Sequence, residues 1–178
     1  MASTDRYPPL TRLLHWATAA CILVLCGVGA WMVEQSYYDP WYHKGLTLHR
    51  VLGMLALALG LGFVLRKPFT RSPPLPARMP RWQSHAAHAV HAAFYLLMLL
   101  VPLSGYLVST SAGAAIPVYD WFEIPALIRV DEASREWAIR IHYYAAYGTL
   151  LLAALHAGAA LKHQFIDRDG LLARMGWR

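Results

Sequence analysis

Four stretches of this sequence lack charged residues over lengths that suit a membrane-crossing helix. We expect spans at about residues 13–33, 46–65, 88–110 and 141–161. An α-helix needs ~20 apolar residues to cross the ~30 Å hydrocarbon core of a bilayer. The second stretch is charge-free only from Val51 to Leu65, so Arg50 is expected at the interface, where its guanidinium can reach water. The pattern predicts an all-α fold, a four-helix transmembrane bundle.

Composition supports a membrane environment. Hydrophobic residues make up 57% of the chain and charged residues 15%, whereas a soluble domain usually carries ~25% charged residues. The basic residues flank the spans and form no stripe alternating with stacking aromatic residues. The net charge of +6 therefore does not indicate a nucleic-acid partner. We expect residues 1–178 to form one membrane domain surrounded by lipid.

The basic residues are divided unequally between the two sides of the predicted bundle. With four spans, the N-terminal segment, the 66–81 loop and the C-terminal tail share one side, and they carry 11 of the 16 basic residues. Most of the acidic residues lie on the other side. Because loops rich in lysine and arginine stay in the cytoplasm, we expect both termini to be cytoplasmic.

Three other segments each need an interpretation. Residues 66–81 contain five basic residues, five prolines and no acidic residue, which predicts a solvated, extended loop. Residues 131–140 are expected to form a short amphipathic helix on the outer surface. The first apolar run could instead be a cleaved signal peptide, but it is long for that role and cleavage would remove His15.

Two histidines in the last span have a spacing that suggests two cofactor sites. His142 and His156 are 14 residues apart, a separation that advances a helix by ~21 Å and turns it to within ~40° of four full turns. Their imidazoles therefore share one face, one near each membrane surface. An imidazole inside a membrane-spanning helix is costly and so functional by default, although a lone one can simply hydrogen-bond a neighbour.

The up-and-down topology supplies a partner for each of these two histidines. Span one rises from the inner surface, so His15 lies near that surface, and span two descends from the outer surface, so His49 lies near the outer one. We therefore expect His15 to pair with His156 at the inner surface, and His49 to pair with His142 at the outer surface. Isolated core histidines would not be expected to match in depth twice.

Paired imidazoles suit haem iron better than zinc or copper. Haem iron takes two axial ligands, whereas zinc or copper needs more, and no carboxylate or thiolate lies at either depth. No C-x-x-C-H motif is present, so any haem must be held without thioether bonds. Gly53 and Gly148 are expected to give a flat macrocycle room against the helices, although glycines also serve helix–helix packing.

The histidine pattern resembles that of the bacterial cytochrome b561 family. The matching features, which cover nearly the whole chain, are His15-Trp16, His49, His88-x-x-His91 and His142-x13-His156. The resemblance implies a bacterial inner-membrane protein with two b haems, whose axial ligands are His15, His49, His142 and His156. Because stand-alone members include superoxide oxidase, it also implies electron transfer from superoxide to ubiquinone, with His163 linked to the quinone site.

Three histidines at the inner depth have open roles. His88 and His91 begin span three, so either could replace His15 as a ligand. They could also contact haem propionates, line a quinone pocket or cap the helix. His163 is expected to donate a proton to the quinone, because imidazole exchanges protons near neutral pH, with Gln164 as a neighbouring contact. The alternative is that His163 is only an interfacial polar residue.

Two arginines lie beside the outer ligands. Arg50 follows His49 directly, and Arg140 precedes His142 by two residues. Their positive charge is expected to attract an anionic donor. The alternative is that both are interfacial anchors.

Two functions fit these features. The first is a self-contained oxidoreductase that takes electrons from superoxide or another small one-electron donor outside and passes them to ubiquinone. The second is a membrane-anchor subunit that relays electrons between a partner dehydrogenase or hydrogenase and quinone. A transporter or a purely structural protein would not explain paired histidines at two depths.

Overall fold

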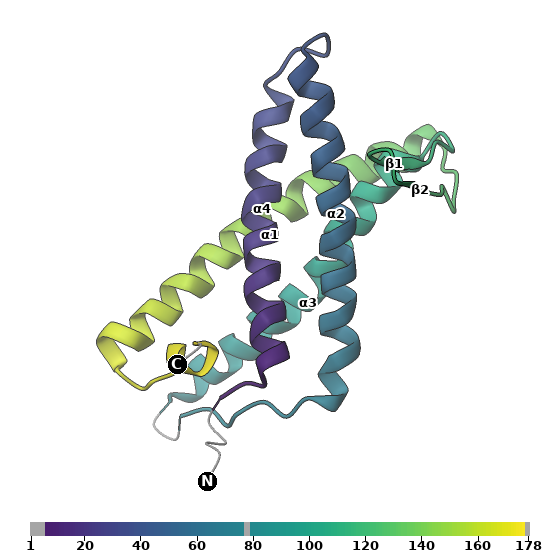
Figure 1. Cartoon of the computed structure of the whole chain (residues 1–178). Coiled ribbons are helices and arrows are strands. Elements are labelled where there is room, and N and C mark those ends of the chain that lie inside the picture. The colour runs from purple at the N-terminus through teal and green to yellow at the C-terminus, as the bar shows by residue number, and fades with distance from the viewer. Residues whose placement is uncertain (1–5, 77–78, 177–178) are drawn as a thin grey trace.

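The computed structural model describes residues 6–76 and 79–176, in which four long helices dominate (Figure 1). They are α1 (Pro9–Val33), α2 (Pro40–Arg66), α3 (Arg81–Thr110) and α4 (Glu132–Lys162). Each is long and apolar enough to cross a membrane. The predicted all-α, four-helix transmembrane fold is confirmed.

Short elements connect or follow these helices. A 3₁₀ turn, η1 (Lys67–Phe69), ends the second helix, and the rest of the described 66–81 loop is irregular, as predicted. Strands β1 (Ile116–Val118) and β2 (Phe122–Ile124) form an antiparallel hairpin between α3 and α4. A π-helical turn, η2 (His163–Asp167), and a 3₁₀ turn, η3 (Leu172–Met175), follow α4.

All four helices begin earlier than the predicted spans, and in α2 and α4 an aspartate outside the apolar run caps the start of the helix. Asp39 caps α2 by accepting a hydrogen bond from the Trp41 N–H at 2.8 Å, and Pro40 occupies the first helical position, where its missing N–H costs nothing. Asp131 caps α4 in the same way, accepting from the Ser134 N–H at 2.8 Å. Hydrogen bonds to Ser134 also lower the pKa of the Asp131 carboxyl.

The expectation of a separate surface helix over residues 131–140 is wrong. These residues are the first turns of α4, which runs without a break from Glu132 into the membrane-spanning part. Residues 131–141 contain no glycine or proline, so nothing in the sequence ends a helix there.

The helices pack in chain order. Figure 1 shows α1 and α2 side by side, with α3 and α4 crossing behind them at an angle, and α1 approaches α4 at few points. At mid-membrane, Pro102 cannot donate to the Met98 carbonyl. The α2 backbone lies against that carbonyl at Gly60, where an added Cβ would come within 2.8 Å of the Met98 oxygen. Glycine is therefore required for this contact.

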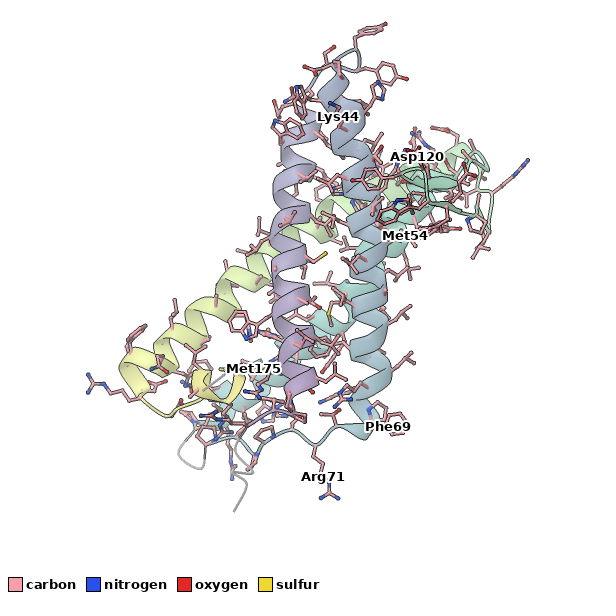
Figure 2. The ribbon with its side chains drawn as sticks, viewed as in Figure 1. Lys44, Met54, Phe69, Arg71, Asp120 and Met175 are labelled. Carbon is pink, nitrogen blue, oxygen red and sulfur yellow. The ribbon has the colours of Figure 1, made fainter. Side chains whose placement is uncertain are left out.

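Most large apolar side chains point outward. Leu23, Leu96 and Leu151 are each 60–64% exposed on their helices, and side chains project from all sides of the helices in Figure 2. Water would disfavour so much continuous apolar surface, whereas lipid tails do not. The exposed apolar side chains are therefore suited to contact with the lipid tails of a bilayer.

The first and last described segments of the chain meet at the end of the bundle where α4 finishes. We call residues 168–176 the C-terminal strap. The Tyr7 N–H donates to the Arg174 carbonyl at 3.2 Å, the Trp16 indole donates to the Met175 carbonyl at 3.0 Å, and Arg12 donates to the Gly176 carbonyl. The strap thus lies against the start of α1, beside His15. We call this the inner end.

Candidate functional site

One histidine pair lies in the half of the bundle away from the termini. The imidazoles of His49 on α2 and His142 on α4 have ring centroids 6.0 Å apart and an interplanar angle of 80°. The structure therefore brings together the two residues that topology predicted for the outer pair. We call them the outer pair.

The ring of His142 is held by α3. Its Nδ1 lies 2.9 Å from the Val101 carbonyl oxygen and 3.4 Å from the Ser104 hydroxyl. An Nδ1–H donated to that carbonyl leaves Nε2 with its lone pair free, which is the state that binds a metal. The backbone of α3 thus selects the coordinating nitrogen of His142.

Two glycines let these rings lie close to neighbouring helices. A Cβ added at Gly105 would come within 2.9 Å of the His142 ring, and one added at Gly29 would come within 3.0 Å of the His49 ring. Larger residues at either position would displace the imidazoles. The sequence analysis missed both glycines, because they matter only once the helix packing is known.

The inner end holds three imidazoles. His156 on α4 has a ring centroid 6.3 Å from that of His15 on α1 and 5.7 Å from that of His91 on α3. Phe94, one helical turn beyond His91, packs edge-on against His156 at 5.6 Å. The predicted partner His15 is therefore present, and so is the alternative partner His91.

These separations test whether a haem fits. Two imidazoles bound to one metal through N–metal bonds of ~2.0–2.1 Å have ring centroids roughly 6 Å apart, close to the spacing of both pairs. Gly53 and Gly148 adjoin open space, since a Cβ added at either would meet nothing within 4 Å. The residues present suit a haem held by two histidines, with the ring beside the helices.

Arg50 directly follows His49 on α2 and is half-buried. Its Nε is buried and has no hydrogen-bond partner among the residues that the structure describes. A buried N–H without a partner is costly, so an anion such as a propionate or an anionic substrate would satisfy this nitrogen. Arg140, by contrast, is exposed and stacks on the Trp137 ring at 5.8 Å.

The remaining predicted residues lie at the inner end. His88 is exposed, and its Nδ1 lies 2.7 Å from the Ser84 carbonyl oxygen of its own helix. Gln164 lines an open pocket of about 380 Å³ together with Phe165, Arg168, Gly170 and Ala173. This pocket lies between the end of α4 and the C-terminal strap.

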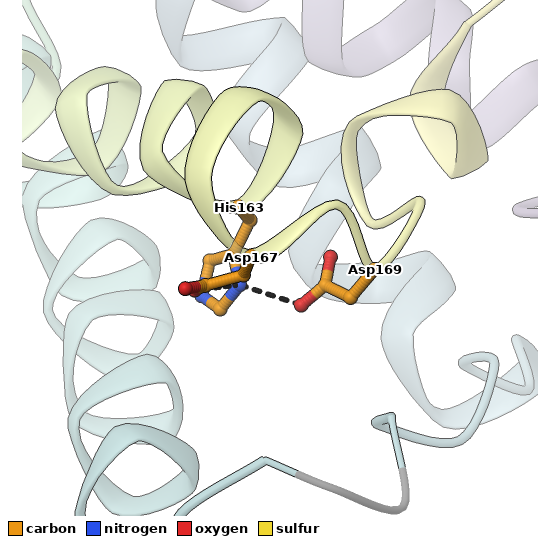
Figure 3. A group of neighbouring side chains, drawn as sticks. All are labelled: His163, Asp167 and Asp169. Atoms are coloured by element: carbon orange, nitrogen blue, oxygen red, sulfur yellow. Dashed lines mark hydrogen bonds and ion pairs between the residues drawn. The ribbon is translucent and has the colours of Figure 1, made fainter.

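His163 is joined to two carboxylates (Figure 3). Its Nδ1 lies 2.6 Å from Asp169 Oδ2 and 3.1 Å from Asp167 Oδ2. The His163 side chain is only 14% exposed. The sequence analysis singled out His163 but missed both aspartates, which the π-helical turn and the strap bring back to it.

The chain is similar to known proteins over nearly its whole length. Residues 6–178 match the family model for prokaryotic cytochrome b561. The chain is 37% identical to cytochrome b561 homolog 2 of Escherichia coli (strain K12), over 96% of this chain and 91% of that protein. It is 31% identical to cytochrome b562 of Cereibacter sphaeroides, over 98% of each chain. It is 23% identical to the probable superoxide oxidase CybB of Yersinia pestis, over 96% of this chain and 95% of that protein.

Proposed function

This chain belongs to the prokaryotic cytochrome b561 family, and from that premise we propose that it passes electrons from superoxide to ubiquinone. Family membership makes it a haem b-binding, multi-pass electron-transfer protein of the bacterial inner membrane. The donor, the acceptor and the number of haems are the proposed parts. We propose that both termini face the cytoplasm, so that the outer pair faces the periplasm.

The observation that carries the proposal is that α4 contributes one histidine to each of two separate imidazole pairs. His142 and His156 of α4 each face a histidine from another helix, at centroid distances of 6.0 and 6.3 Å. Because 14 residues of helix span ~21 Å, the pairs serve opposite leaflets. We propose two b haems, one between His49 and His142 and one between His15 and His156.

Haem b held by two imidazoles has no open coordination position, so it supplies one-electron transfer at its edge and not oxygen binding at the iron. The protein residues account for the other requirements. Arg50, the residue after His49, has a buried Nε without a partner among the described residues, and we propose that it attracts an anionic donor. The name of the Yersinia pestis relative supports superoxide as that donor.

The acceptor end requires protons as well as electrons. Reduction of ubiquinone consumes two electrons and two protons, and His163 lies seven residues beyond His156, at the same end of α4. We propose that His163 donates a proton to the bound quinone. Gln164 and the adjacent pocket are proposed as part of the quinone contact surface, with His88 at its edge.

The purified chain in detergent provides the test. With an enzymatic superoxide generator and a soluble ubiquinone analogue, it should consume superoxide and form quinol in a ratio of about two to one, as the electron count requires. Superoxide dismutase should abolish quinol formation, and a sample without haem should show none. If superoxide leaves the haems oxidised while a co-purifying iron–sulfur dehydrogenase reduces them, the chain is an anchor subunit and the proposal is wrong.

A further inference from the structure

A cluster of charged side chains lies where α4 passes into the C-terminal strap. Asp169 Oδ2 lies 2.6 Å from His163 Nδ1, and Asp167 Oδ2 lies 3.1 Å from the same nitrogen. The Lys162 ammonium bonds to Asp167 at 2.5 Å. The side chains of His163 and Asp169 are mostly buried, at 14% and 19% exposure, so these contacts are shielded from water.

The two aspartates are not equivalent. Asp167 is shared between Lys162 and His163, and is the more exposed of the pair at 29%. Asp169 makes the shorter contact with His163 through Oδ2, while its Oδ1 accepts from the Leu171 N–H at 3.1 Å. Both oxygens of Asp169 are thus engaged, which fixes the carboxylate against the imidazole.

The backbone conformation between His163 and Asp169 brings the two side chains together. The π-helical turn widens the end of α4, and Arg168 then takes a left-handed conformation with φ of 54°, which reverses the chain. The strap that follows is fastened to α1 through Trp16 and Met175. The backbone is therefore fixed both before Asp169, by the π-helical turn, and after it, by the fastened strap, and this fixes the position of the carboxylate.

The three acceptor and donor atoms of the cluster lie within 4.8 Å of one another, a donor set that suits a divalent cation as well as a proton. The ammonium of Lys162 and the imidazole N–H already face the two carboxylates, and these contacts satisfy the cluster without a metal. These contacts favour a role of the cluster in proton transfer over a role in binding a metal ion.

We propose that Asp169 is the positioning residue for His163. By accepting the Nδ1–H, it fixes the tautomer and orientation of the ring, so that Nε2 is the nitrogen that exchanges a proton with the quinone. In many enzymes a carboxylate accepts a hydrogen bond from one nitrogen of a histidine ring and so orients the other nitrogen, which takes part in the chemistry. This inference rests on the proposed function, because it requires quinone to be the acceptor.

The proposed reaction conserves electrons and protons. Two superoxide anions each lose one electron and become dioxygen, and ubiquinone gains two electrons and two protons to become ubiquinol. For each of the two protons, a His163 ring protonated at both nitrogens breaks its Nε2–H bond as a quinone O–H bond forms, which leaves the neutral Nδ1–H tautomer bound to Asp169. The imidazole then regains a proton from cytoplasmic water while Asp169 keeps its hold on Nδ1.

A stopped-flow experiment on the haem-loaded protein isolates the quinone step. The haems are reduced chemically, a soluble ubiquinone analogue is added, and haem reoxidation is followed optically. Asp169→Ala should slow reoxidation by about 10- to 100-fold, the usual range for loss of an orienting partner. Asp169→Asn keeps a hydrogen-bond acceptor and should lose less. Asp120→Asn removes an exposed carboxylate elsewhere, and should leave the rate unchanged.

A double variant separates positioning from general structural damage. If Asp169 acts through His163, the variant carrying both His163→Ala and Asp169→Ala should be no slower than His163→Ala alone. Nitrogen-15 spectra of labelled histidine should show one Nδ1-protonated tautomer for His163, and a mixture after Asp169→Ala. Superoxide-driven haem reduction, which occurs at the outer end, should be unchanged in every variant.

The contrary outcomes are distinct. If the two single substitutions multiply in the double variant, or if Asp169→Ala matches Asp120→Asn, Asp169 does not position His163 and this inference fails alone. If the unmodified chain, fully reduced, is not reoxidised by quinone at all, the proposed function fails and this inference fails with it. Should Asp169→Ala not fold, the reoxidation rate of Asp169→Asn decides: a rate below that of Asp120→Asn supports the inference, and an equal rate overturns it.

Discussion

The Val101 carbonyl oxygen of α3 lies 2.9 Å from Nδ1 of His142 on α4. Through this contact α3, which contributes no histidine to the outer pair, engages Nδ1 of His142 and leaves Nε2 free to bind a metal. The Ser104 hydroxyl donates to the same carbonyl at 2.8 Å, so one backbone oxygen organises both side chains. The outer site thus depends on α3 as well as on the two helices that supply its imidazoles.

Removal of one outer imidazole should cost one haem. His142→Ala should reduce haem content from two to one per chain, because each proposed haem has its own pair of ligands. Haem content per mole of protein and the remaining absorption bands measure this. Loss of both haems from a protein that stays monodisperse and helical would show that the two sites assemble together.

The inner site offers a sharper test, because two imidazoles compete to pair with His156. His15→Ala should remove the inner haem, while His91→Ala should retain it with a shifted spectrum. Haem content and low-temperature absorption distinguish the two. If His15→Ala retains both haems and His91→Ala loses one, His91 is the axial ligand, as its 5.7 Å centroid distance allows.

A single methyl group should disturb the outer site. Gly105→Ala would place a Cβ within 2.9 Å of the His142 ring, and the resulting overpacking should cost about 1–3 kcal/mol and lower outer-haem occupancy. Gly158→Ala is the matched control, since a Cβ there meets nothing within 4 Å. Equal haem content in the two variants would contradict the close approach of α3 and His142.

The sequence predicted those parts of the structure that depend on local pattern and on topology. Charge-free stretches identify the four spans, and an even number of crossings brings His49 to the level of His142. Contacts that depend on how closely two helices approach have no corresponding pattern in the sequence. Gly29 and Gly105 are ordinary small residues in a membrane helix until the imidazoles lie against them.

The inner end was harder to predict for a different reason. The C-terminal strap is fastened mainly through backbone carbonyls, such as that of Met175 accepting from Trp16, and backbone acceptors carry no sequence signal. The return of Asp169 to His163 depends on a π-helical turn and on the left-handed conformation of Arg168. Neither feature has a distinctive residue pattern, so sequence alone identified His163 without its partner.

Salt dependence should reveal whether charge steers the donor to the outer pair. Superoxide is an anion, and the field of exposed charges is screened over ~8–10 Å at physiological ionic strength. The rate of superoxide-driven haem reduction should therefore fall as salt is added. Arg50→Ala should weaken that dependence with both haems retained, because Arg50 directly follows His49 on α2 and its buried Nε is unpaired among the described residues. Arg140→Ala should have a smaller effect, since that side chain stacks on Trp137.

Lys44→Ala is the matched control for this experiment. It removes one positive charge from the same end of the molecule, but Lys44 lies near the tip of the α1–α2 hairpin and stacks on Trp41 at 4.5 Å (Figure 2). If all three substitutions flatten the salt dependence equally, the net charge of the outer surface attracts the donor and no single arginine does so. If none of them changes it, Arg50 serves to bind a propionate or to anchor the helix, and the donor arrives without electrostatic guidance.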